Sequence, residues 1–382
     1  MLNRLFVGGV LVVIVTLLPF DSTRAGLDLS LGGGSFYAID NNVFRQSTNT
    51  VIDSLYGLDA KVGLVVGNGR NFVNSSYQAS LTRYSVQSAQ NIETHSLRSG
   101  LGIAIGNSYK MGLSGEVKTG HDERGTLVTE YTFSETPILF RSAEVGGNVE
   151  YLNSDGNGYS LKPKLLSKRF VGLVDSERDA YLGSLTSILT RRHSGKSSWT
   201  VNTKVSGNYF SNPVYVKRSG IDGVASLGFE WNITGKSEGK LLVGWSQALF
   251  RMTSGTKPAA SYVNLDWLWK RKSYNSFKAS ISRGLGTTVD VGLVNSIGNR
   301  ISLSANNTFK SGFSIGTNVL GDYSQAASGK NSFYYRYMVN ASKNIGIINV
   351  GLSAEDNFFD SVLAGRSYRA TVFKINLGIS LL

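Results

Sequence analysis

The chain has 382 residues, among them 44 glycines, 18 tyrosines and 18 phenylalanines but no cysteine, and its formal net charge is +13. The lack of cysteine excludes disulfides, thiol catalysis and thiolate metal sites. A mean hydropathy of −0.07 is too polar for a bundle of membrane helices, but it is ordinary for a membrane barrel, in which only every second strand residue faces lipid. The basic excess favours anionic partners.

The first 25 residues differ from everything that follows. Arg4 precedes an apolar run of 16 residues, 5–20, and Thr23 and Ala25 are small residues of the kind that a signal peptidase reads. This pattern predicts a secretory signal peptide, residues 1–25, cleaved after Ala25. The alternative is a retained anchor, but a spanning helix needs about 20 apolar residues. No later stretch is that apolar over that length, so we expect residues 26–382 to form a single domain outside the cytoplasm.

Segments of alternating polarity, separated by turn residues, fill the chain from Gly26 onward. The last segment is the clearest, with one face made of Phe373, Ile375, Leu377, Ile379 and Leu381. Such alternation predicts strands with one face toward lipid and the other toward an aqueous interior. We expect 18 strands, near residues 26–38, 54–66, 71–85, 95–106, 109–120, 140–153, 158–170, 179–192, 197–210, 222–234, 239–252, 260–271, 275–286, 296–309, 312–324, 331–344, 346–358 and 368–382.

The connections between these segments alternate in length. Short, turn-rich connections at residues 67–70, 106–108, 154–158, 235–238 and 310–312 predict periplasmic turns. Longer and more polar connections at residues 41–50, 86–93, 120–135, 171–178 and 211–219 predict outer loops. A soluble β-sandwich has no reason to separate its connections in this way. The predicted fold is therefore all-β, a transmembrane antiparallel up-and-down β-barrel of about 18 strands with both termini in the periplasm.

The residues between the lipid-facing positions are expected to line the lumen. The basic ones are Lys61, Arg98, Lys118, Lys162, Lys164, Lys204, Lys240, Lys270, Lys278, Arg300, Arg336 and Lys374. The acidic ones are Asp28, Asp59, Glu116, Glu144, Glu150, Glu230, Asp266 and Glu355. Because Lys and Arg linings favour anions, the bases predict an anion track. The alternative is that these charges pair across strands and only keep the interior wet. No plug domain is visible, although the loop 120–135 could fold inward.

Sequence motifs for catalysis are absent. Only His95, His121 and His193 could act as a histidine base, and the chain has no GxSxG, HExxH or Walker motif. His121-Asp122-Glu123, in a predicted outer loop, could form a hydrolase site at the rim, but adjacent polar loop residues are usually just solvated. We therefore predict no enzyme activity, no cofactor and no metal.

The predicted partners follow from charge and from aromatic residues. Bases spread along the whole chain argue against nucleic acid, whereas Arg70, Arg191 and Arg192 could meet the phosphates of lipopolysaccharide or other lipid headgroups. Aromatic residues are expected in interfacial belts, where they contact outer-membrane lipid, rather than in a sugar-stacking track. They are Tyr77, Tyr159, Tyr209, Trp231, Trp245, Trp267, Trp269, Phe333, Tyr335 and Tyr337.

Three parts of the chain resemble a known family. The segment Asp40-Asn41-Asn42-Val43-Phe44-Arg45, the hairpin Thr234-Gly235-Lys236 within "SLGFEWNITGKSEGKLLVGWSQALF", and "LDWLWKRKSYNSFKASISRGLG" are similar to the outer-membrane β-barrel porins found with exopolysaccharide secretion systems, the VpsM-like and Wzp-like barrels. The resemblance implies a conduit for a secreted polysaccharide that works beside a periplasmic polysaccharide-export protein. The chain departs from barrels in general by ending Ile379-Ser380-Leu381-Leu382, without the usual terminal aromatic residue.

The sequence thus leads to a principal hypothesis and two alternatives. The principal one is an outer-membrane conduit that exports an anionic exopolysaccharide for a biofilm or capsule. The first alternative is a general diffusion porin for small anionic solutes, and the second is a hydrolase at the outer rim.

Overall fold

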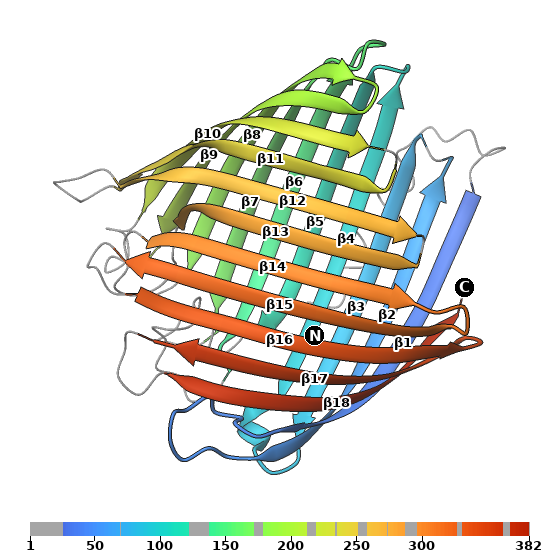
Figure 1. Cartoon of the computed structure of the whole chain (residues 1–382), viewed down its shortest axis with the longest axis vertical. Helices are drawn as coiled ribbons and strands as arrows, with labels where there is room; N and C mark the ends of the chain where they lie inside the picture. The colour runs from blue at the N-terminus through green and yellow to red at the C-terminus, as the bar shows by residue number, and fades with distance from the viewer. Residues whose placement is uncertain are drawn as a thin grey trace, which may run out of the picture.

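Eighteen antiparallel strands, each hydrogen-bonded to the next along the chain, form a sheet that closes because β1 also pairs with β18 (Figure 1). The computed structural model describes residues 26–68, 70–121, 137–171, 179–211, 219–233, 235–250, 258–272, 274–286, 296–326, 331–361 and 367–381. The predicted signal peptide lies outside them. The closed antiparallel sheet confirms the predicted barrel and its strand number.

The strand bounds follow the predicted pattern along the whole chain. They are β1 (Gly26–Asp40), β2 (Asp53–Gly67), β3 (Phe72–Tyr84), β4 (Ile92–Ile105), β5 (Tyr109–His121), β6 (Leu139–Leu152), β7 (Gly158–Phe170), β8 (Ala180–Ser194), β9 (Ser197–Phe210), β10 (Gly220–Ile233), β11 (Ser237–Phe250), β12 (Ala259–Lys272), β13 (Asn275–Gly286), β14 (Ser296–Thr308), β15 (Phe313–Ala326), β16 (Asn331–Ile345), β17 (Ile348–Asp360) and β18 (Tyr368–Leu381). A short 3₁₀ helix, η2 (Ser88–Gln90), lies between β3 and β4. No helix in the described part of the chain is long and apolar enough to cross a membrane.

Several predicted connections were placed too wide. Ile92 and Glu93 belong to β4, because they pair with Thr82 and Leu81 of β3. His121 likewise belongs to β5 and pairs with Leu139. Polarity alone does not mark these ends, since a strand continues wherever its backbone finds a partner.

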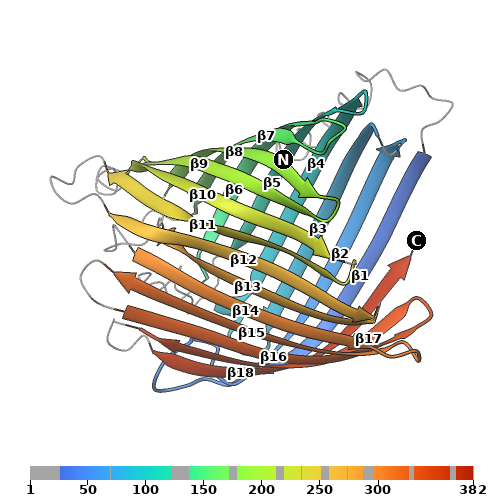
Figure 2. The same cartoon turned by 45° about the horizontal axis from the view of Figure 1, so that its top comes forward.

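Strands β1–β9 form one wall and β10–β18 the facing wall (Figure 2). In the view of Figure 1 the strands of the two walls cross at a steep angle, as tilted strands on opposite sides of a closed barrel do. Glycines make the short hairpin turns possible at one end of the barrel. Gly106 and Gly235 have φ angles of +60° and +65°, in the left-handed region that favours glycine.

The pairing register determines which residues face the lumen, because residues directly opposite each other in neighbouring strands point to the same side. Lys374 lies opposite Ala38 and Ser353 on the inner face. Its neighbour Phe373 points outward and is 60% exposed. The same alternation repeats from strand to strand, so the outer face carries a continuous apolar surface. A surface of that kind needs an apolar environment such as lipid.

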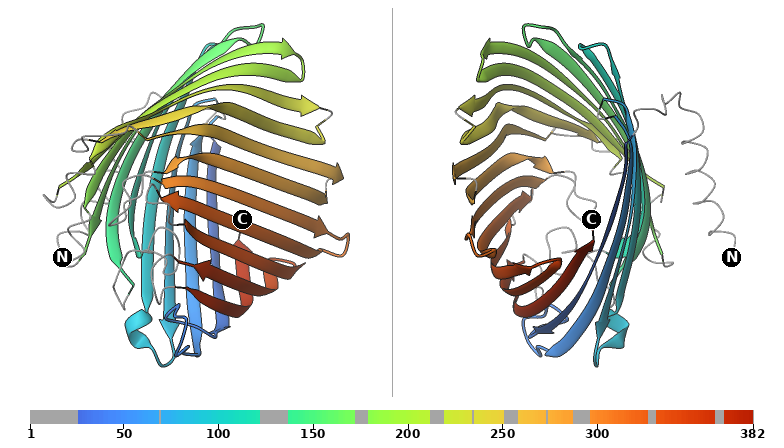
Figure 3. Two further views of the ribbon diagram at one scale, coloured as in Figure 1. Left: turned by 60° about the vertical axis from the view of Figure 1, so that its left-hand side comes forward. Right: turned by 90° about the vertical axis from the view of Figure 1, so that its right-hand side faces the viewer.

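Buried side chains gather on the inner face near the loop end of the barrel, the end that carries the longer connections. Phe140 packs with Phe170, and Phe210 packs with Ala180. A third cluster joins Tyr334, Phe359, Tyr368 and Ala370. The left view of Figure 3 brings this end of the barrel forward. The inner wall is thus packed near the loops and polar below them.

The first loop, residues 41–52, ties the two ends of the chain together at the loop end. Asn42 is completely buried, and its Nδ2 donates to the Gln46 carbonyl (2.8 Å) and to the Arg369 carbonyl of β18 (3.0 Å). The Thr371 amide donates to Asn41 Oδ1 at 2.7 Å. We call the group Asp40, Asn41, Asn42 and Arg45 the seam knot, because it bridges the β1–β18 seam.

Arg45 completes the seam knot. Its guanidinium lies 2.8 Å from both oxygens of Asp40 and 5.9 Å from the ring centroid of Tyr368. Burial acts to lower the pKa of Arg45, but the Asp40 carboxylate and its hydrogen bond raise the pKa above the ordinary value. Arg45 also has a φ of +53°, a left-handed conformation that costs about 1–3 kcal/mol outside glycine. The ion pair offsets that strain.

The candidate site in the lumen

Every residue predicted to line the lumen lies on the inner face by the pairing register. The bases are Lys61, Arg98, Lys118, Lys162, Lys164, Lys204, Lys240, Lys270, Lys278, Arg300, Arg336 and Lys374. The acids are Asp28, Asp59, Glu116, Glu144, Glu150, Glu230, Asp266 and Glu355. Further charged residues on the inner face escaped the prediction. They include Lys110, Lys168, Asp222, Glu238 and Asp322.

One ladder of charges crosses β4–β7. Arg98, Glu116 and Glu144 lie directly opposite one another on three consecutive strands. Glu116 accepts from Arg98 Nε at 3.1 Å and from the Ser96 hydroxyl at 2.8 Å. Lys164 Nζ lies 2.8 Å from Glu144. The two bases and the two carboxylates of this ladder therefore balance one another.

A second ladder crosses β10–β12. Lys240 lies directly opposite both Glu230 and Asp266, and its Nζ is 2.5 Å from Glu230. Asp266 accepts from the Ser280 hydroxyl at 2.7 Å. Lys270 Nζ lies 3.3 Å from Glu238 nearer the turn end. Here too a base sits between carboxylates.

A bidentate ion pair in the lumen joins β14 and β15. Arg300 donates from Nε to Asp322 Oδ1 at 2.6 Å and from its Nη2 to Asp322 Oδ2 at 2.8 Å. Asp322 is 7% exposed, and bidentate Arg–carboxylate pairs are the strongest ion pairs in proteins. Little in the sequence indicates that Asp322 lines the lumen, because Asp322 lies between Gly321 and Tyr323 near the end of a strand.

Breaking this pair is expected to destabilise the barrel more than breaking an exposed one. Asp322→Asn removes the buried carboxylate that holds Arg300, whose own side chain is 60% exposed, and should lower the free energy of unfolding by about 1.5–3 kcal/mol. Glu238→Gln is the matched control, because the Lys270–Glu238 pair is exposed and worth less than about 1 kcal/mol. Urea unfolding in detergent, followed by tryptophan fluorescence, compares the two variants. Equal losses would mean that burial does not strengthen the Arg300–Asp322 pair.

The remaining bases have no ion pair within the described ranges. They are Lys61, Lys118, Lys204, Lys278, Arg336 and Lys374. Lys374 Nζ lies 3.6 Å from the Phe36 ring centroid, a cation–π contact that leaves its charge uncompensated. Lys61, Lys204 and Lys278 are exposed to the lumen. Ion pairs therefore neutralise some of the basic residues in the lumen. The others remain available to bind anions.

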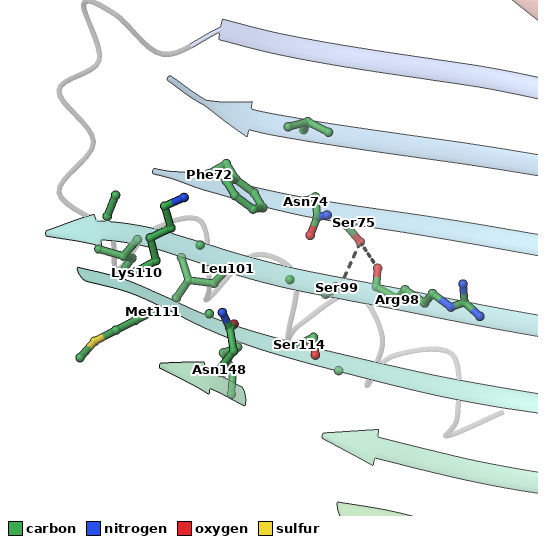
Figure 4. A pocket seen from close by; sticks show the side chains of 18 of the residues that line it. Phe72, Asn74, Ser75, Arg98, Ser99, Leu101, Lys110, Met111, Ser114 and Asn148 are labelled. Atoms are coloured by element: carbon green, nitrogen blue, oxygen red, sulfur yellow. Dashed lines mark hydrogen bonds between the residues drawn. The ribbon is translucent and has the colours of Figure 1, made fainter. Parts of the chain in front are cut away.

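The inner wall is hollowed between β1 and β6 (Figure 4). The hollow has a volume of about 950 Å³ and is bordered by Lys61, Arg98 and Glu144. Asn74 and Asn148 lie over glycines of the next strand, where a Cβ atom at Gly100 or Gly112 would overlap their amides. Small residues thus leave space, and amides and charges supply hydrogen-bonding groups. The sequence analysis missed these asparagines, because a polar residue on an inner strand face gives no special signal.

The histidines do not form a catalytic arrangement among the described residues. His95 lies on the outer face, with Nδ1 2.7 Å from the Tyr77 hydroxyl and Nε2 2.8 Å from Glu93. His121 ends β5 on the outer face, while Asp122 and Glu123 lie outside the described residues. His193 lies near the turn end of β8. The contacts of His95 are with a phenol and a carboxylate, neither of which is a serine nucleophile.

The aromatic residues expected in belts all lie on the outer face. At the turn end Trp199 packs on Phe229 with ring centroids 4.9 Å apart, and Trp267 contacts Phe277 at 5.7 Å. At the loop end Tyr335 stacks on Phe358 at 5.4 Å. Aromatic rings at both edges of an apolar band are typical of membrane barrels.

The three arginines assigned to lipid phosphates lie at the turn end. Arg70 donates to the Gly106 carbonyl at 3.2 Å, and Arg192 Nε donates to the Ser194 carbonyl at 3.1 Å on the inner face. Arg191 points outward near the same end of β8. These three arginines therefore lie at the end of the barrel opposite the longer connections, and their contact with lipid headgroups stays a prediction. Alternation in sequence reveals the face of a residue but not which end of the barrel it occupies.

Comparison with known proteins finds likeness in structure only. No protein-family model matches the chain, and no curated protein matches it. The chain is similar in structure to the outer membrane protein OpdK from Pseudomonas aeruginosa, with a TM-score of 0.50 and 10% sequence identity over 93% of this chain and 99% of that one. Pseudomonas aeruginosa OccK2 (OpdF) and OpdQ have the same TM-score and identity, each over 93% of this chain and 98% of theirs. The chain therefore has the closed barrel fold of these outer-membrane proteins.

Proposed function

We propose that the protein is an outer-membrane channel through which small anionic solutes diffuse, exported behind its signal peptide and without enzyme activity. The observation that carries the proposal is the set of uncompensated bases on the inner wall of a closed barrel. Lys204 on β9 stands on the opposite side of the 18-stranded ring from Lys374 on β18, and neither has an ion pair within the described ranges. Anions crossing the lumen therefore meet positive charge on both walls, and such a lining favours them over cations. The fold shared with outer-membrane proteins supports the location.

A second candidate is the export of an acidic polysaccharide beside a periplasmic partner. The resemblance of the seam knot segment and of two strand pairs to polysaccharide-associated barrels implies it. The hollow lined by Asn74 and Asn148 offers amides to sugar hydroxyls, which supports a polymer as well as a small solute. The lysines without ion pairs on both walls support the diffusion channel as the first candidate.

Planar-bilayer recording tests the proposed function. The purified chain should conduct as soon as it inserts, and its reversal potential in a KCl gradient should have the sign of an anion-preferring pore. A polysaccharide conduit should instead stay closed to small ions until its partner is added. An open, cation-preferring pore contradicts both candidates.

Deletion of the gene separates the two candidates in the cell. A diffusion channel should leave secreted polysaccharide unchanged and slow the uptake of small anions. Loss of secreted polysaccharide with normal uptake would favour the second candidate and refute the first.

A further inference from the structure

An apolar groove of about 690 Å³ lies over β6–β9 on the outer face of the barrel, near the loop end. Gly183 and Gly207 occupy outward-facing positions at the floor of the groove, and the groove is deep there because glycine has no side chain. The residues that line it include Val145, Leu165, Tyr181, Gly183, Gly207 and Tyr209. Its width comes from these four adjacent strands, seen side by side in Figure 2, and from the start of β10, which contributes Gly220 and Ile221. A groove of this chemistry suits a hydrocarbon chain.

Two arginines stand at the head of this groove. Arg141 of β6 and Arg169 of β7 lie directly opposite each other, point outward and are exposed. Arg169 Nη2 lies 3.1 Å from the hydroxyl of Tyr181, which itself lines the groove. Within the described ranges neither arginine has an ion pair, and Oδ1 of the nearby Asp179 accepts the Phe170 amide at 2.7 Å. Like charges directly opposite each other repel, and cations on a lipid-facing wall are costly.

A bound anion would relieve both penalties. Two adjacent guanidinium groups present parallel N–H donors, which match the oxygens of a phosphate. We propose that Arg141 and Arg169 bind a phosphate of lipopolysaccharide while an acyl chain of the same molecule occupies the groove. This acidic glycolipid fits because it carries phosphate and hydrocarbon together, in the leaflet beside the loops. The inference rests on the proposed outer-membrane location and not on what the lumen conducts.

Other arginines on the outer face are held by partners within the protein. A second apolar groove, of about 390 Å³, lies over β1 and β16–β18. The arginine at the loop end of that wall, Arg369, is held by Asp356 at 3.0 and 3.1 Å. Arg283 on β13 donates to Ser261 at 2.9 Å and to Asn299 at 2.8 Å. Both arginines already have partners within the protein, so of these two grooves the β6–β9 groove is the one that lies beside arginines without an ion pair in the described ranges.

Binding of purified lipid A to the full chain in detergent tests the proposal. The double variant Arg141→Gln/Arg169→Gln should bind lipid A at least about tenfold more weakly than the natural chain, a change that corresponds to the loss of one charge-assisted contact pair. Arg283→Gln is the matched control, because it removes an outward arginine at the loop end of another wall, and it should bind normally. Heat-modifiable migration on a gel confirms that each variant is folded. Arg141→Lys/Arg169→Lys, which keeps the charge, should recover part of the binding.

The competing ligands define the outcomes. Lipid A stripped of its phosphates should bind as weakly as the double variant binds intact lipid A. Equal affinity for phosphatidylglycerol would show a general anionic-lipid site and overturn the assignment to lipopolysaccharide. Unchanged binding by the folded double variant, an equal loss in Arg283→Gln, or no binding by the natural chain would each refute the proposal.

Discussion

Replacing Lys61, Lys204 and Lys278 together by glutamate is expected to reverse the ion preference of the pore. These three bases lie on separate strands, are exposed to the lumen and have no ion pair within the described residues. A unit charge about 10 Å from a permeating ion changes its energy by about 0.4 kcal/mol in water. Three substitutions that each change the charge by two units change the energy of each ion by about 2.5 kcal/mol without screening, with opposite signs for chloride and potassium. Screening over a Debye length of about 10 Å at 0.1 M salt reduces this energy several-fold. The chloride-to-potassium permeability ratio should therefore fall by at least about tenfold, enough to favour cations.

The matched control for this reversal keeps the net charge of the lumen. The swap Glu230→Lys/Lys240→Glu exchanges the two partners of the ion pair between β10 and β11 and should leave the permeability ratio nearly unchanged. Reversal potentials in 0.1 M and 1 M KCl add a second check, because screening at 1 M shortens the Debye length to about 3 Å and should weaken the difference. If the triple variant keeps the natural preference, the free lysines do not set the selectivity of the pore.

Asn42→Ala is expected to destabilise the closed barrel by about 3 kcal/mol. The completely buried Asn42 side chain makes hydrogen bonds to both backbone groups of Gln46 and to the Arg369 carbonyl. Each such bond contributes about 1 kcal/mol, and a buried carbonyl left without a donor costs further free energy. The shift from folded to unfolded mobility on unboiled gels should occur at a lower temperature and at a lower urea concentration than for the natural chain.

Gln46→Ala provides the control for Asn42→Ala. Gln46 lies in the same loop and is exposed, and its hydrogen bonds to Asn42 use only its backbone atoms, so its truncation should change stability by less than about 0.5 kcal/mol. Similar losses in the two variants would show that general loop packing, rather than the seam knot, stabilises the closure.

The fold was readable from the sequence because a barrel repeats one simple rule. Alternation assigns each residue to a face, and a slip of one position would move every side chain to the wrong side. For that reason residues as distant as Lys61 and Lys374 were both placed on the inner wall correctly. Strand ends were read less well, as at Ile92, because a strand ends where backbone pairing ends and not where polarity changes.

The details of the site were beyond the sequence for physical reasons. Which inner charges are paired depends on the register between strands, so the Arg300–Asp322 contact could not be seen. The hollow beneath Asn74 depends on a glycine of the neighbouring strand, Gly100, that lies 26 positions further along the chain. The position of a lysine or arginine in the lumen can be read from the sequence, but its effect on the passage of ions cannot. That effect depends on the electrostatic potential of the whole lumen, which the conductance measurements above test.

The seam knot also bears on the order in which the barrel assembles. The bond from Asn42 to the Arg369 carbonyl spans 327 positions, and β18 is the last strand to be synthesised. Joining chain ends this far apart costs about 5 kcal/mol of loop entropy, so the first loop can lock only after all other strands have paired in turn. The knot is therefore a late folding event, and its rupture is an early step in unfolding. A substitution that weakens the seam knot should therefore raise the unfolding rate of the native barrel and leave its folding rate almost unchanged.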